Sequence, residues 1–149
     1  MPNDTALSTA EARDLRAFAG MMIPPSAVYG VPGADDEAIF ADIAKNLGRD
    51  RDDVGAALKR LVALGGGAFA DLPAGRRLEV ADAFRGEGGP PLAAITRLIL
   101  LCYYRDDRVM RSLGQEARPP FPRGHVVEQG DWSLLDPVRA RPPMYRTVE

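Results

Sequence analysis

The residues of this chain that are suited to acid–base or metal chemistry are few, and the closest grouping lies near the C-terminus. His125, Glu128 and Asp131 follow one another closely, and an imidazole with two carboxylates is a pattern that enzymes and metal sites use. Zinc sites, however, use several His or Cys ligands at set spacing, and this chain has one His and one Cys. A small enzyme that uses His125 with Asp131 or Glu128 is therefore the least favoured of three hypotheses. We expect His125 to be a surface or interface residue.

The other residues with chemical potential have structural explanations. Cys102 lies inside an apolar run, which predicts a buried small hydrophobic side chain. The glycine run at residues 65–67 lacks the phosphate-loop pattern and is typical of a helix end. The acidic runs at 35–37 and 106–107 stand where helices are expected to begin, and there they complement the helix macrodipole. We predict no catalytic, cofactor-binding or metal-binding residue in this chain.

The C-terminal segment combines proline with the residue types that anchor protein interfaces. Its prolines remove donors that helices and sheets need, yet it holds the only Trp of the chain with Phe, Met, Tyr and several Arg. Ordering one residue costs roughly 1–2 kcal/mol, whereas burying one large apolar side chain returns about 1.5–3 kcal/mol. So extended a segment cannot build a core from its own side chains. It needs a preformed surface, either the body of this protein or a partner.

Arginines beside proline-rich turns suit bidentate pairing with carboxylates or backbone carbonyls at an interface. We therefore predict that the partner-binding residues are Arg118, Phe121, Asp131, Trp132, Leu135, Arg139, Arg141, Tyr145 and Arg146.

The elements that must position this segment are helical. Apolar residues recur at helical spacing in five stretches, residues 8–22, 35–47, 51–64, 71–85 and 91–104, with a short helical turn at 106–113. Ser8 with Glu11 forms a capping box at the first start. Leu78 and Phe84 share one side of the fourth helix. The fifth helix is apolar nearly all round, which predicts a central helix that the others cover.

These patterns predict an all-α protein, a small bundle of about five helices followed by a long irregular Pro-rich C-terminal tail. We place the helical domain at residues 1–114 and the extended partner-wrapping tail at residues 115–149. The 149 residues carry a net charge of −2 without a basic stripe, so nucleic acid is not the expected partner. The longest apolar run, residues 92–104, contains Thr96 and Arg97 and is shorter than the roughly 20 residues that cross a bilayer, so no membrane insertion is expected.

The order of several motifs resembles one protein family. A helical segment ending in Met-Ile-Pro-Pro (residues 15–25), an apolar helix ending in Tyr103-Tyr104, and Leu113-Gly114 precede a tail with Arg-Pro-Pro-Phe-Pro (118–122) and Asp131-Trp132. Together they resemble the small (gamma) subunit of gluconate 2-dehydrogenase and the related small subunits of glucose-methanol-choline type FAD-dependent sugar and alcohol dehydrogenases. The resemblance covers about residues 10–146.

The resemblance implies a non-catalytic small subunit that docks on a dehydrogenase large subunit and stabilises or matures it. It also implies that FAD and catalysis belong to the large subunit, in a heterodimer or larger complex. The alternative is a stand-alone helical adaptor or binding protein whose tail packs on its own body. Many members of the family carry a twin-arginine export signal, which this sequence lacks. We therefore expect a cytoplasmic location, or a periplasmic one if the partner carries the signal or the sequence is trimmed.

Overall fold

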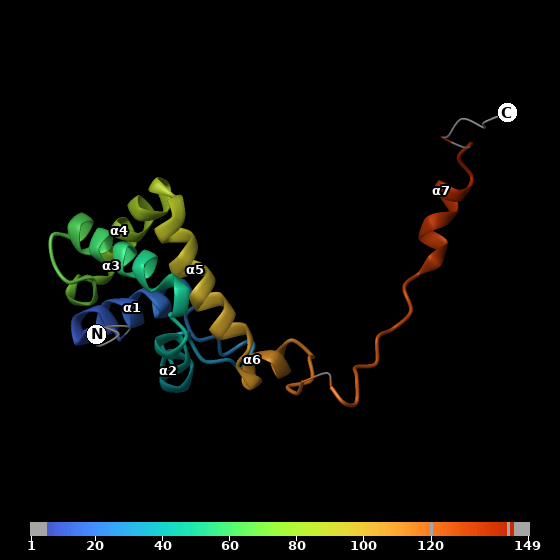
Figure 1. The fold of residues 1–149 in the computed structure, drawn as a ribbon, viewed down its shortest axis with the longest axis horizontal. Coiled ribbons are helices and arrows are strands. Elements are labelled where there is room, and N and C mark those ends of the chain that lie inside the picture. The colour runs from blue at the N-terminus through green and yellow to red at the C-terminus, as the bar shows by residue number, and fades with distance from the viewer. Residues whose placement is uncertain (1–5, 120, 143, 145–149) are drawn as a thin grey trace. The chain divides into compact units, whose positions relative to one another are not determined.

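The chain folds into helices, and the connections between them range from one residue to a loop over residues 23–36 and a longer stretch after α6 (Figure 1). The computed structural model describes residues 6–119, 121–142 and 144. Within those residues there is no β-strand, only one isolated antiparallel bridge between Ser26 and Val31. The prediction of an all-α bundle with a proline-rich tail is confirmed. The α-helices are α1 (Thr9–Met22), α2 (Glu37–Lys45), α3 (Arg51–Gly65), α4 (Ala74–Glu87), α5 (Gly89–Tyr104), α6 (Asp107–Ser112) and α7 (Asp136–Arg139). Short 3-10 helices are η1 (Gly48–Asp50), η2 (Phe69–Asp71) and η3 (Trp132–Leu135).

The helix starts follow from local side-chain chemistry. The predicted capping box at Ser8 is present, because Glu11 N donates to Ser8 Oγ at 3.2 Å and Ser8 N donates to the Glu11 carboxylate at 2.9 Å. Asp36 caps α2 and accepts from Ala38 N at 3.1 Å. The fourth helix begins later than predicted, with Pro73 as its N-terminal cap residue. Side-chain acceptors satisfy amides that the first helical turn leaves without partners.

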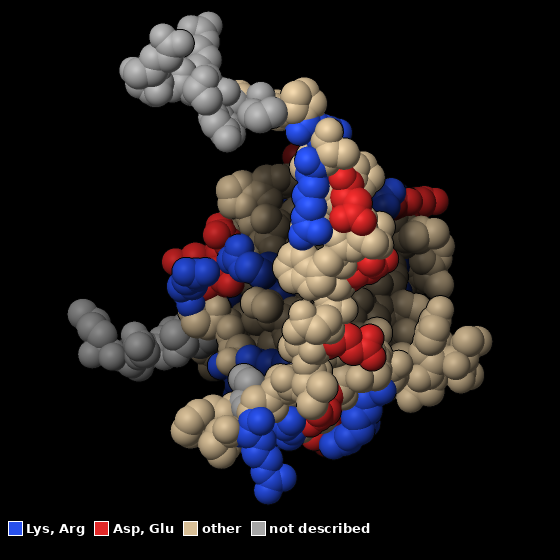
Figure 2. Space-filling model, turned by 90° about the vertical axis from the view of Figure 1, so that its right-hand side faces the viewer, with Lys and Arg blue, Asp and Glu red and all other residues tan. Residues whose placement is uncertain are grey.

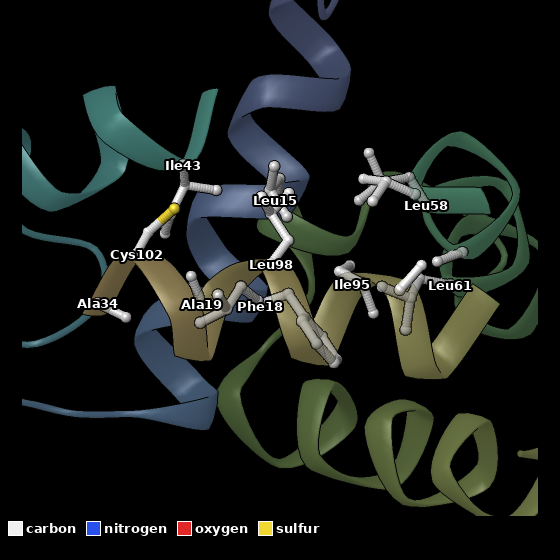
Figure 3. Close-up of a cluster of buried hydrophobic side chains, with 14 of the residues drawn as sticks. Leu15, Phe18, Ala19, Ala34, Ile43, Leu58, Leu61, Ile95, Leu98 and Cys102 are labelled. Atoms are coloured by element: carbon white, nitrogen blue, oxygen red, sulfur yellow. The ribbon is translucent and has the colours of Figure 1, made fainter. Parts of the chain in front are cut away.

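One hydrophobic core joins α1 to α5 (Figure 3). Leu15, Phe18 and Ala19 of α1 meet residues of α3 and α5 there. The Phe18 ring packs edge-on against Phe69 and Phe84, with ring centroids 5.9 and 6.2 Å apart. Aromatic rings favour such edge-to-face geometry because the positive ring edge meets the negative ring face.

A buried carboxylate connects this core to the loop after α3. Asp14 is 4% exposed, and its Oδ1 accepts from Ala70 N at 2.8 Å. The bond satisfies the amide of a residue in η2 and holds that short helix against α1.

The prediction that the other helices cover α5 is wrong, and α4 buries a residue that the sequence analysis did not name. The fifth helix is not covered all round, since Leu101 and Tyr104 on α5 are 61% and 52% exposed. The buried residues of α5 recur at helical spacing and leave the opposite side of the helix uncovered: Ala94, Ile95, Leu98, Ile99 and Cys102. On α4, Leu78 is 57% exposed and Val80 takes its expected place in the core beside Phe84. Helical spacing had placed Leu78, Ala81 and Phe84 on one side of α4, whereas the side that is buried carries Val80 and Phe84.

The chain divides into two units, Met1–Ala117 and Arg118–Glu149. The sequence suggested a boundary slightly earlier, between Gly114 and Gln115. Backbone bonds extend the first unit past that point, because Gln115 N donates to Met110 O at 2.9 Å. We call the first unit the body and the second unit the tail.

Candidate partner-binding surface

The tail exposes nearly all of its described side chains. Every described residue from 119 to 144 is exposed to solvent. Phe121 is 84% exposed, Trp132 61% and Met144 92%. The described apolar residues of the tail therefore do not bury one another, as the cost of ordering so extended a segment led us to expect.

A turn at the start of the tail is held by Arg118. Its Nη2 donates to Gly124 O at 2.6 Å, and its Nη1 donates to Pro119 O at 3.4 Å. The guanidinium thus bonds carbonyls of its own segment and closes a turn there. Phe121 lies in that turn and is exposed to solvent. The role of Arg118 seen here is to shape the turn that presents Phe121.

The middle of the tail contains a helical segment that the sequence analysis missed. η3 runs directly into α7, and together they form the coiled ribbon labelled α7 in Figure 1. Asp131 caps it, since its Oδ1 accepts from Ser133 N at 3.0 Å and from Ser133 Oγ at 2.6 Å. Pro137 is tolerated because it falls in the first turn of α7. The prediction of an irregular tail did not include this short helical segment.

The helical segment has an apolar edge. Trp132, Leu135 and Val138 are spaced three residues apart, which places them on one side of a tightly wound helix. They are 61%, 40% and 55% exposed. A short helix with an apolar edge is a form that proteins insert into hydrophobic grooves of partners.

The remaining predicted partner-binding residues have different positions. Arg139 Nη1 lies 3.3 Å from Asp136 Oδ1, in an ion pair within α7. Arg141 is exposed. Tyr145 and Arg146 lie outside the described residues. The described members of the predicted set lie in one segment, and all of them except the half-buried Arg118 are exposed. Arg118, Asp131 and Arg139 also make local bonds that shape the segment.

The weak catalytic candidate is not assembled. His125 is exposed, and within the described residues no hydrogen bond or ion pair joins it to Glu128 or Asp131. Hydrogen bonds from Ser133 engage the Asp131 carboxylate and lower its pKa. In residues 6–119, 121–142 and 144, no three His, Cys, Asp or Glu side chains are grouped in a way that could hold a metal ion.

The structural interpretations of the other candidates are confirmed. Cys102 is 2% exposed, and burial raises the pKa of its thiol to about 11, so it stays protonated. Gly66 ends α3 with a φ of 76°, a left-handed conformation that favours glycine. Asp106 caps α6 and accepts from Arg108 N at 2.9 Å.

Arginine–carboxylate pairs fasten α2 to the end of α5 and to α6. Arg105 Nε donates to Asp42 Oδ2 at 2.5 Å, and Arg108 Nη2 donates to Asp36 Oδ1 at 2.7 Å. The bond to Arg108 is the main cause that lowers the pKa of Asp36, and the bond to Arg105 does the same for Asp42. Tyr103 OH also donates to Pro32 O at 3.2 Å, so the end of α5 is held in place from two sides.

A second exposed apolar surface lies on the body, and the sequence analysis did not identify it. We call it the outer stripe of α5: Ala93, Arg97, Leu101 and Tyr104, all exposed and all at helical spacing. The sequence did contain evidence for this surface, because a helix that is apolar on every side needs to be covered on every side. The error was to assume that this body supplies all of that cover.

Charged side chains on the surface are mixed in sign. On the face drawn in Figure 2, Lys and Arg lie interspersed with Asp and Glu and do not gather in one basic area. This arrangement differs from the basic stripe that nucleic-acid-binding proteins present. Among the described helices, none combines the length and the apolar character that crossing a bilayer requires.

The chain was also compared with known proteins. No family model, no curated protein and no solved structure matches it.

Proposed function

We propose that this chain is a non-catalytic small subunit that binds a FAD-dependent sugar or alcohol dehydrogenase and stabilises or matures it. The observation that carries the binding role is the exposure of the tail anchors, above all Phe121 and Trp132. Large aromatic side chains dominate binding energy when a partner encloses them. The flavoprotein nature of the partner is supported by the order of motifs from residue 15 to Trp132.

In this proposal the tail is a strap. The turn at Arg118 presents one aromatic ring, and the apolar edge of Trp132, Leu135 and Val138 presents a second site farther along. Two anchor sites joined by one stretch of chain bind more tightly than either site alone, since binding at the first site raises the local concentration of the second. Flavin binding and hydride transfer belong to the partner.

The test is co-purification. The full chain and a variant that ends at Ala117 are each co-expressed with a FAD-dependent dehydrogenase large subunit from the same organism. The full chain should co-purify with the large subunit, and the variant should fold but no longer do so. The body contains every buried residue of the core, so circular dichroism and a cooperative melt of the variant provide the folding control. Co-purification of the shortened chain at the level of the full one contradicts the strap.

The alternative, a stand-alone helical binding protein, predicts a different thermal melt for the same two chains. The isolated full chain would then melt more stably than the shortened chain, because tail side chains would pack on the body. Our proposal predicts equal melting temperatures for the two chains and a larger hydrodynamic radius for the full chain than for a sphere of its mass.

A further inference from the structure

The body carries a second apolar surface that continues beyond the outer stripe of α5. Leu92 and Thr96 of α5 line one hollow together with Ala93, Arg97 and Leu101 of the outer stripe. The same two residues line a groove of about 450 Å³ between α1, α4 and α5. Met21, Met22 and the exposed Leu78 line the same groove. Methionine side chains adapt to the shape of an apolar partner. The outer stripe and this groove form one band across the body.

At its other end the band reaches a cluster of aromatic residues. Tyr104 packs edge-on against Tyr103, with ring centroids 5.3 Å apart. Tyr104, Tyr29 and Leu113 line a hollow of about 280 Å³, and all three are more than half exposed, at 52%, 73% and 57%. Exposed tyrosines beside aliphatic side chains are typical of interface anchors.

The charges on the band are already neutralised within the body. Arg97, in the middle of the outer stripe, lies 2.5 Å from Asp50 Oδ1. Arg85, at the edge of the groove, lies 3.1 Å from Asp82 Oδ1. A partner surface that covers the band therefore needs no compensating charge, and an apolar one fits it best.

The position of Arg97 argues against a second copy of this chain as the occupant. It stands near the midpoint of α5, which runs from Gly89 to Tyr104. In a twofold antiparallel pairing of two such helices, the midpoints face one another. The two Arg97–Asp50 ion pairs would then be crowded at one point of the interface, where the cost of removing charged groups from water is paid twice, whereas a different protein would cover one such pair.

The chain connects the band directly to the tail. Leu113 and Phe121 are eight residues apart, so they are separated by at most about 28 Å. A protein that holds Phe121 in a pocket is thereby kept within reach of the Tyr104 and Leu113 end of the band.

We infer that the band is a second docking surface for the same large subunit that the tail binds, and that it contacts an apolar surface of that subunit. This inference rests on the proposed function for the identity of the partner. The tail and the band are then two parts of one bivalent interface.

Photo-crosslinking in the full complex tests it. The photoreactive residue p-benzoylphenylalanine is placed at Leu101 on the outer stripe, at Phe121 in the tail, and at the exposed Lys59 on α3 as a control. Leu101 and Phe121 should both crosslink to the same large subunit, and Lys59 should not. A product from Leu101 that joins two copies of this chain, one that joins it to its own tail, or no product at all, overturns the inference.

The same experiment separates the two proposals. If both positions crosslink to one partner that holds no flavin, the bivalent interface stands and the proposed function fails. An affinity measurement gives a second check: Leu101→Gln should weaken binding about tenfold. Val62→Gln, at an apolar residue of α3 that is 38% exposed, should leave binding unchanged. Equal affinity of the two variants contradicts the role of the outer stripe.

Discussion

Replacement of the only tryptophan tests the strap at a single side chain. Trp132→Ala removes the largest apolar group from the edge that it shares with Leu135 and Val138. It leaves Asp131 and Ser133 in place, so the bonds that cap the helical segment are retained. The variant therefore changes the anchor without removing the cap.

The expected loss follows from the exposure of the indole. A tryptophan buries about 150–250 Å² in a full pocket, and 61% of Trp132 is still exposed in the free chain. Enclosing that remainder removes about 90–150 Å² from water, which is worth about 2–4 kcal/mol at roughly 25 cal/mol per Å². A loss near the middle of this range weakens Kd about 100-fold.

Isothermal titration of the full chain against the purified large subunit measures this loss. Val127→Ala is the matched control, because Val127 is an exposed tail residue, 81% exposed, outside the apolar edge. We expect the Kd of the control variant to change less than about threefold. We expect the melting temperature of both variants to be unchanged. A loss of affinity below threefold for Trp132→Ala, or a lower melting temperature of the isolated variant, would refute the reasoning.

Three further predictions concern the body. Asp14→Ala leaves the amide of Ala70 without its acceptor and should cost about 1.5–3 kcal/mol of unfolding free energy in urea titrations; a cost under about 0.5 kcal/mol contradicts this role. The Cys102 thiol, with its pKa raised to about 11 by burial, should resist iodoacetamide in the folded protein at pH 8 and react after unfolding; rapid labelling of the folded chain would disprove its burial. Because Arg108 lowers the pKa of Asp36, the pair stabilises the fold above the usual Asp range, and this stabilisation is lost as pH falls through the lowered pKa. Arg108→Met, which also removes the bonds to Asp106, should therefore be less stable than wild type at pH 6, and the difference should shrink as pH falls below the usual Asp range in urea titrations; a difference that does not vary with pH excludes these ion pairs as its source.

The sequence predicted the helices well where local chemistry determines them. Ser8 with Glu11 marked the start of α1, and Gly66 marked the end of α3, because caps and left-handed turns depend on a few neighbouring residues. Burial was predicted less well, since it depends on which neighbours the fold supplies. The apolar spacing of α5 is the same whether a helix of this body or another protein covers Leu101.

The tail shows the same division between local and distant causes. Prolines at both ends of the tail led us to predict an irregular segment throughout. The helical segment depends instead on Asp131 as a cap and on Pro137 in a first turn, two positions at which these residue types favour a helix. Its proposed anchors were predicted from residue type alone, whereas the bonds that Arg118 makes within its own turn were not predicted.

The intrinsic fluorescence of Trp132 tests the central claim most directly, since no other tryptophan contributes to the signal. In the isolated full chain, the account predicts emission typical of an indole in water and ready quenching by acrylamide. On addition of the large subunit, the emission should shift to the blue and become protected from the quencher. Blue-shifted, protected emission from the isolated chain would contradict the account, because the anchor would already be buried without a partner.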